Sequence, residues 1–121
     1  MMNTNETLII PRKDITLTQY RVEDPDKLVR VIRSFAKEGQ ISPILLIANP
    51  EDSYPNYRMR SDLPKMVIDK KVYAIAAGNQ KIFAIDALGI ENVMIKVYTN
   101  NAEMREERRK QNEWYNTQEK V

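Results

Sequence analysis

A glycine-centred turn is the part of the sequence best suited to chemistry. An apolar run at residues 72–76 is followed by Gly-Asn-Gln-Lys at residues 78–81, and then by an apolar segment that stops at Gly89. This order predicts a strand, a tight turn and a helix. Free backbone N–H groups and the helix dipole make a helix N-terminus attractive to anions. We therefore expect a phosphate at the four residues of this 78–81 turn, which are Gly78, Asn79, Gln80 and Lys81. The alternative is a purely structural turn with a solvated lysine.

Basic residues on the first predicted helix form a second candidate site. That helix begins at Asp24, a capping residue, and ends at Gly39, and it has one apolar face. Four basic residues lie on the opposite face: Lys27, Arg30, Arg33 and Lys37. A basic face of this kind can follow a nucleic-acid backbone. The alternative is an ordinary solvated face.

A long loop and a charged tail carry the remaining candidates. The loop at residues 49–65 places Arg58 and Arg60 near tyrosines, a combination that suits base stacking and phosphate contact. A loop without function is the alternative. Residues 101–121 form a charged, helical tail with nearly balanced charge. Its adjacent Trp114 and Tyr115 favour contact with a protein partner or self-association, unless they pack on the domain itself.

Composition narrows the function classes. The 121 residues include no cysteine and no histidine, and the net charge is +2. The absence of cysteine excludes thiol chemistry and fits a reducing cytoplasm. We expect no catalytic residues and no metal site built from protein side chains, because no nucleophile–base pair and no ligand cluster stands out. Asp86, alone on an apolar helix, is expected to pair with a basic group. No apolar run is long enough for a signal-peptide core or a membrane span.

These elements predict an α+β fold in which a small mixed sheet packs against two helices. Residues 1–100 form the domain and residues 101–121 its helical tail. Strands are expected at residues 8–10, 15–18, 44–47, 66–68, 72–76 and 93–97. The continuous apolar run at residues 44–47 is typical of a central, buried strand. The second helix, which follows the 78–81 turn, is apolar almost all round and is expected to be buried.

Several strings, in the same order, resemble the N-terminal domain of ParB-like proteins in the ParB/sulfiredoxin superfamily. These strings are GQISPI at residues 39–44, the strand leading into the 78–81 turn, ALGI at residues 87–90 and the strand at 93–97. The resemblance covers residues 8–98, without the helix-turn-helix of full-length ParB. It implies that Arg21, upstream of the first helix, and Ser42 join the 78–81 turn in a nucleotide site.

The sequence departs from that family at its phosphate ligands. The family usually has two arginines, or a His-Arg pair, after the glycine, where this chain has Gln80 and Lys81. Lysine meets a phosphate as a point charge and loses the bidentate geometry of arginine. Sulfiredoxin chemistry is excluded because it needs a cysteine.

The resemblance therefore favours a nucleotide- or DNA-binding regulatory module of a bacterium, phage or plasmid, located in the cytoplasm. One alternative is a Mg-dependent nuclease or nucleoside triphosphatase, with a nucleoside triphosphate and Mg²⁺ as ligands. The other is a protein-interaction module with a degenerate pocket.

Overall fold

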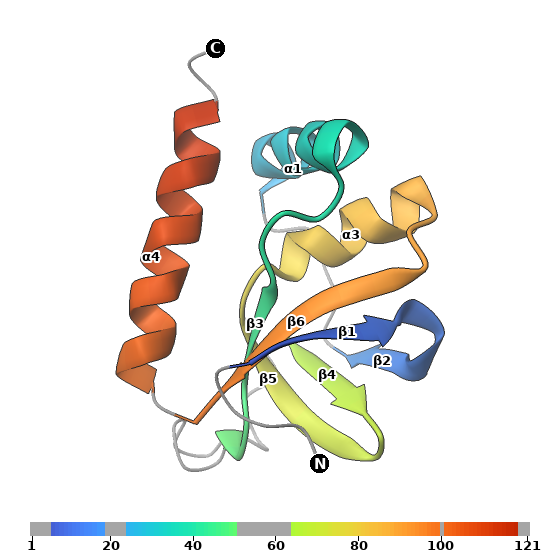
Figure 1. Cartoon of the computed structure of the whole chain (residues 1–121), viewed down its shortest axis with the longest axis vertical. Helices are drawn as coiled ribbons and strands as arrows, with labels where there is room; N and C mark the ends of the chain where they lie inside the picture. The colour runs from blue at the N-terminus through green and yellow to red at the C-terminus, as the bar shows by residue number, and fades with distance from the viewer. Residues whose placement is uncertain (1–5, 19–23, 51–63, 100, 119–121) are drawn as a thin grey trace.

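The computed structural model describes residues 6–18, 24–50, 64–99 and 101–118 and confirms the α+β fold (Figure 1). The elements in chain order are β1 (Thr7–Pro11), η1 (Arg12–Asp14), β2 (Ile15–Thr18), α1 (Pro25–Glu38), β3 (Ile44–Ile47), β4 (Lys65–Ile68), β5 (Lys71–Ala77), α3 (Asn79–Leu88), β6 (Asn92–Tyr98) and α4 (Asn101–Gln118). Every strand and helix expected in these ranges is present, and the ends differ from the predictions by one or two residues.

The six strands form one mixed sheet in the order β1-β6-β3-β5-β4-β2. Among the described strands, β3 and β6 pair in parallel and the other neighbours pair antiparallel. The central position of β3 confirms the interpretation of its apolar run, because all four of its side chains are buried. Asp69 and Lys70 both have positive φ angles, of 51° and 65°. This is the geometry that a two-residue turn between antiparallel strands requires, and it joins β4 to β5.

Helix α1 begins and ends where its capping residues predict. The Asp24 side chain accepts a hydrogen bond of 3.1 Å from the backbone N–H of Lys27, and Pro25 occupies the first helical position. The backbone N–H of Gly39 closes the other end by donating to the Phe35 carbonyl oxygen. The apolar stripe buries Val31 and Phe35 fully. These two side chains fix which face of α1 is available to ligands.

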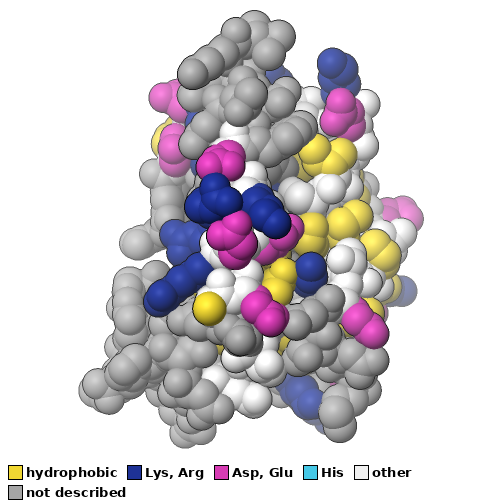
Figure 2. Space-filling model, turned by 60° about the vertical axis from the view of Figure 1, so that its left-hand side comes forward, with side chains coloured by type: hydrophobic (Ala, Val, Ile, Leu, Met, Phe, Trp, Pro, Cys, Tyr) yellow, Lys and Arg dark blue, Asp and Glu magenta, His cyan; other side chains and the backbone are white. Residues whose placement is uncertain are grey.

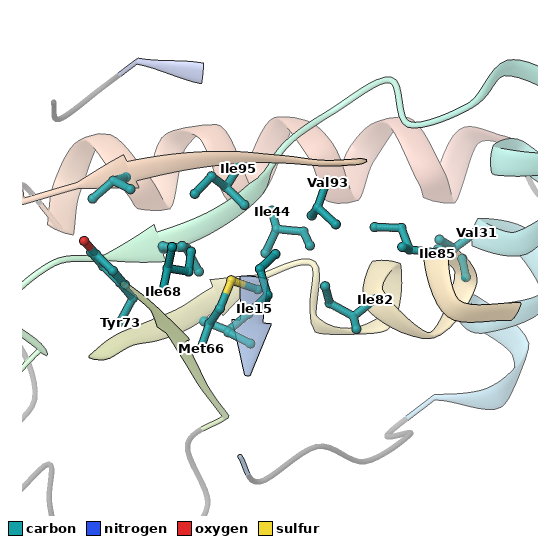
Figure 3. Close-up of a cluster of buried hydrophobic side chains, with 14 of the residues drawn as sticks. Ile15, Val31, Ile44, Met66, Ile68, Tyr73, Ile82, Ile85, Val93 and Ile95 are labelled. Atoms are coloured by element: carbon teal, nitrogen blue, oxygen red, sulfur yellow. The ribbon is translucent and has the colours of Figure 1, made fainter. Parts of the chain in front are cut away.

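Helices α1 and α3 cover one face of the sheet and enclose the main core (Figures 1 and 3). Side chains from every strand enter this core, and α3 contributes Ile82 and Ile85, both fully buried. The prediction that α3 is buried all round is wrong in its last turn, where Ala87 and Leu88 are exposed.

Helix α4 packs on the opposite face (Figure 1). Its Met104 joins a small buried cluster that contains Leu45 and Ile47 of β3, Ala74 of β5 and Tyr98 of β6. The helix then continues beyond the sheet and contacts α1. Within the described ranges, no helix combines the length and the apolar character that crossing a membrane demands.

Candidate functional site

The residues predicted as the 78–81 turn lie where β5 meets α3: Gly78 caps the helix, and Asn79, Gln80 and Lys81 form its first turn. Gly78 has φ +91°, in the left-handed region, and its carbonyl oxygen accepts a hydrogen bond of 2.9 Å from the backbone N–H of Lys81. A Cβ atom at Gly78 would lie 3.1 Å from Lys81 Cδ and 3.4 Å from Ile44 Cα. Glycine is therefore required by its backbone angle, and a Cβ atom there would also press on the buried Lys81 side chain.

Lys81 is the buried centre of this site. Only 3% of the residue is exposed. Its Nζ donates to the carbonyl oxygen of Pro43, at 3.1 Å, and to Oε1 of Gln111. The Gln111 Nε2 atom also donates to the Pro43 carbonyl oxygen, at 3.1 Å. One lysine thus links the segment before β3 to helix α4 from its position in the first turn of α3.

The surroundings of Lys81 disfavour its charged form. The pKa of Lys81 is lowered to about 7, mainly by burial and secondly by the nearby charge of Lys27, while the charge of Glu107 acts in the opposite direction. A neutral amine still has two N–H groups, enough for both of its acceptors. The hydrogen bonds seen here therefore do not require Lys81 to be protonated.

Charged groups on α1 and α4 influence Lys27 and, through it, Lys81. Burial lowers the pKa of Lys27, and the charges of Arg108 on α4 and Arg30 on α1 lower it as well. The carboxylate of Asp24 opposes them. Lys27 in turn lowers the pKa of Lys81. Cations that destabilise one another across an interface form a place where an anion is favoured.

Two other predicted phosphate ligands lie near Lys81. Gln80 precedes it in the chain, and Ser42 belongs to a segment that packs beside it. Ser42 precedes Pro43, whose carbonyl oxygen binds Lys81, so the structure brings the 42–44 segment to the turn. Gln80 is buried, with 6% exposed. Its Oε1 and the Oγ of Ser42 are buried atoms without a hydrogen-bond partner. Such atoms are costly in a folded protein unless a ligand or water satisfies them. Arg21 and the side chain of Asn79 lie outside the described residues.

The predicted basic face of α1 is divided into two parts. Lys27 and Arg30 are half-buried, with Lys27 directed to the charges of α3 and α4, whereas Arg33 and Lys37 are exposed. The face is therefore not one continuous solvated track. Arg58 and Arg60, the other predicted nucleic-acid contacts, lie outside the described residues.

The outer surface of α4 carries charges of both signs, as the tail sequence predicts (Figure 2). Arg109 pairs with Glu106 at 2.7 Å and with Glu113 at 2.6 Å. Trp114 and Tyr115 fall in the last part of α4, but their side chains are outside the described part of the chain, so the partner contact stays a prediction. The expected pairing of Asp86 is confirmed, because Arg12 Nε lies 2.8 Å from its Oδ1.

Two glutamines that sequence reasoning missed hold the site together. Gln111 follows Met104 by seven positions, which places both on the same face of α4. That spacing was the signal that could have identified it. Gln40 uses its side-chain amide like a strand: Nε2 donates to the Met94 carbonyl oxygen at 2.8 Å, and Oε1 accepts from the Met94 N–H at 2.7 Å. It fixes the segment that carries Ser42 and Pro43 against β6.

Among the described residues, no group of three or more carboxylate, cysteine or histidine side chains is arranged to hold a metal ion. Comparisons of the chain with protein-family models, with curated proteins and with solved structures found no match. The resemblance to ParB-like domains therefore remains a prediction from the sequence.

Proposed function

We propose that this protein is a ParB-like regulatory module that binds the phosphate groups of a nucleotide at the start of α3. The observation that carries the proposal is the burial of Lys81 in the first turn of α3, where it donates to the Pro43 carbonyl oxygen and is influenced by the charge of Lys27 on α1. The turn with a required glycine and the two buried polar atoms without partners support it. The lack of cysteine fits an action in the cytoplasm of a bacterium or phage-infected host.

A nucleotide fits this geometry better than a nucleic-acid duplex. Lys81 is buried and Lys27 is half-buried, so the two lysines do not present an exposed surface for a duplex backbone. A triphosphate is small and flexible enough to enter between helices. Because lysine supplies a point charge and no bidentate contact, we expect binding without strong discrimination among phosphate geometries.

The experiment is a titration of the full chain with CTP, ATP, GTP and inorganic triphosphate, with and without Mg²⁺. Binding to the folded state raises the melting temperature, and calorimetry gives the dissociation constant. The test variant is Lys81→Met, which removes the amine donor and leaves an unbranched side chain only one atom shorter. The matched control is Lys71→Ala, which removes an exposed lysine at the opposite end of β5.

We expect the wild type and Lys71→Ala to bind one of these ligands with similar affinity. The dissociation constant of Lys81→Met for that ligand should be at least ten-fold higher. If none of the ligands stabilises the wild type or any of the variants, the proposed function is wrong. If Lys81→Met binds the ligand as tightly as the wild type, the ligand binds at a place other than the 78–81 turn.

Contact with a DNA backbone is a second candidate, favoured by the exposure of Arg33 and Lys37 on α1. The double variant Arg33→Ala/Lys37→Ala should then weaken binding to a random duplex and reduce its salt dependence by about two counterions. If the double variant binds the duplex with the affinity and salt dependence of the wild type, contact with a DNA backbone through these residues is wrong. That result would not bear on the proposed nucleotide site.

A further inference from the structure

Helix α4 covers Lys81, the residue that a ligand must reach in the proposed function. While Gln111 and Pro43 hold Lys81, only 3% of this lysine is exposed, and no ligand in solution can reach its Nζ. We propose that α4 is an autoinhibitory cover, in which the Gln111 amide competes with a ligand phosphate for Lys81. This inference rests on the proposed function and specifies its regulation.

The attachment of α4 to the rest of the protein is slight. Among the α4 side chains that the structure describes, only Met104 and Gln111 are buried, and Glu107 between them is partly buried. The other described side chains of this helix are exposed and mostly charged. The buried contacts of this part of the helix are thus one thioether in a small apolar cluster and one amide latch, to which Glu103 and Glu107 add attraction to Lys96 on β6. Such a helix can leave the sheet without unfolding the domain, because the main core lies on the other face.

The chemistry of the latch favours exchange for an anion. The Gln111 oxygen is neutral, so it accepts a hydrogen bond from Lys81 but does not relieve the repulsion between Lys81 and Lys27. A phosphate oxygen accepts the same hydrogen bond and also neutralises positive charge, and charge-assisted hydrogen bonds are the stronger kind. A phosphate at Lys81 and a docked Gln111 are therefore mutually exclusive, and the phosphate has the electrostatic advantage.

Competition of this kind is reciprocal. If the docked helix weakens ligand binding by some factor, bound ligand must weaken docking of the helix by the same factor. Removing the latch alone should then tighten ligand binding although the substitution adds no contact to the ligand. That sign separates a cover from a ligand-binding residue, whose removal weakens binding.

The test compares Gln111→Ala with the wild type and with Lys110→Ala, all as full chains. Lys110 is exposed and adjacent to Gln111, so its alanine variant controls for a change on α4 that leaves the latch intact. The probes are inorganic triphosphate and CTP, and the dissociation constants are measured by calorimetry. Circular dichroism and hydrogen exchange of the β3 amides show that each variant keeps the folded core.

We expect Gln111→Ala to bind about ten-fold more tightly than the wild type, within the usual range of coupling between sites. Lys110→Ala should bind equally or slightly more weakly, because it only removes a positive charge. Equal affinity of Gln111→Ala and wild type overturns the cover and leaves the proposed function standing. Absence of binding by both overturns the proposed function and the cover together. Binding by Gln111→Ala alone supports both.

Discussion

The two faces of the sheet are stabilised in different ways. The face beneath α1 and α3 buries a continuous apolar core to which every strand contributes (Figure 3). Among the described side chains, the face beneath α4 buries a small cluster to which the helix itself adds Met104. Helix α1 is amphipathic and α3 is rich in apolar residues, whereas the described outer surface of α4 is charged (Figure 2).

This contrast assigns different roles to the two faces. The hydrophobic effect scales with buried apolar area, so the first face supplies most of the free energy of folding. The second face is held by a weak apolar contact and by polar groups around Lys81. Function that requires movement is drawn from the less stable parts of a protein. The fold thus combines a stable half with a cover that can be displaced.

Ile82→Ala should give the largest loss of stability, because Ile82 is fully buried between α3 and the sheet. Removal of three carbons from such a position costs about 2–5 kcal/mol. Urea unfolding followed by circular dichroism measures the change in the free energy of unfolding. Ile9→Ala is the matched control, since Ile9 on β1 is 58% exposed and should change stability by less than about 0.5 kcal/mol. Similar losses in the two variants would contradict the position of the core.

Met104→Ala should cost less, about 1–2 kcal/mol, although Met104 is as well buried as Ile82. The reason is that α4 can undock, which limits the loss to the free energy of docking. Hydrogen exchange should show faster exchange of α4 amides with unchanged protection in α3. If α3 and α4 lose protection together, the two faces form one cooperative unit and the contrast drawn here is wrong.

Stability should increase with pH above pH 7, by less than the losses expected from the two core substitutions. The pKa of Lys81 is lower in the folded protein, about 7, than its ordinary value of 10.5. Between these values the unfolded chain binds more protons, so stability rises with pH. At or below pH 7 the cost of a buried charge is fully present. Lys27 from α1 and Glu107 from α4 face the same amine, and Lys27 adds a rise of the same sign.

Urea midpoints measured from pH 7 to pH 9.5 test this effect. We expect the midpoint of the wild type to increase over this range, and that of Lys81→Met to increase less. The increase in the free energy of unfolding with pH cannot exceed the free energy of docking of α4. The reason is that a protein with α4 undocked exposes Lys81 to water and no longer disfavours its charged form. Identical slopes for the two proteins would show that Lys81 does not titrate in this environment.

Much of this fold could be predicted from the sequence because local rules agree with tertiary packing. The cap at Asp24, the apolar run of β3 and the glycine at residue 78 each specify their structure over a few neighbouring residues. The approach of Ser42 to the 78–81 turn followed only from the resemblance to a family, since nothing in the spacing of these residues requires it.

The burial of Lys81 could not be predicted in this way. Its environment depends on Gln111, thirty positions away, and the spacing of Gln111 from Met104 indicates a shared helix face but not that this face meets Lys81. The sequence suggested a tail with balanced charges, and its outer surface has them. The inner face, where Met104 and Gln111 meet the domain, is defined only by the way the chain folds back across the sheet.

The most direct test of the cover is the distance between α4 and the sheet with and without ligand. The chain has no cysteine, so Lys71→Cys on β5 and Lys110→Cys on α4 provide two exposed and unique sites for spin labels. Pulsed electron paramagnetic resonance should show one narrow distribution of distances between the two spin labels in the free protein. Saturating inorganic triphosphate should shift it to longer, broader distances. A distribution that stays unchanged when calorimetry shows the same sample to be saturated would contradict the displacement of α4.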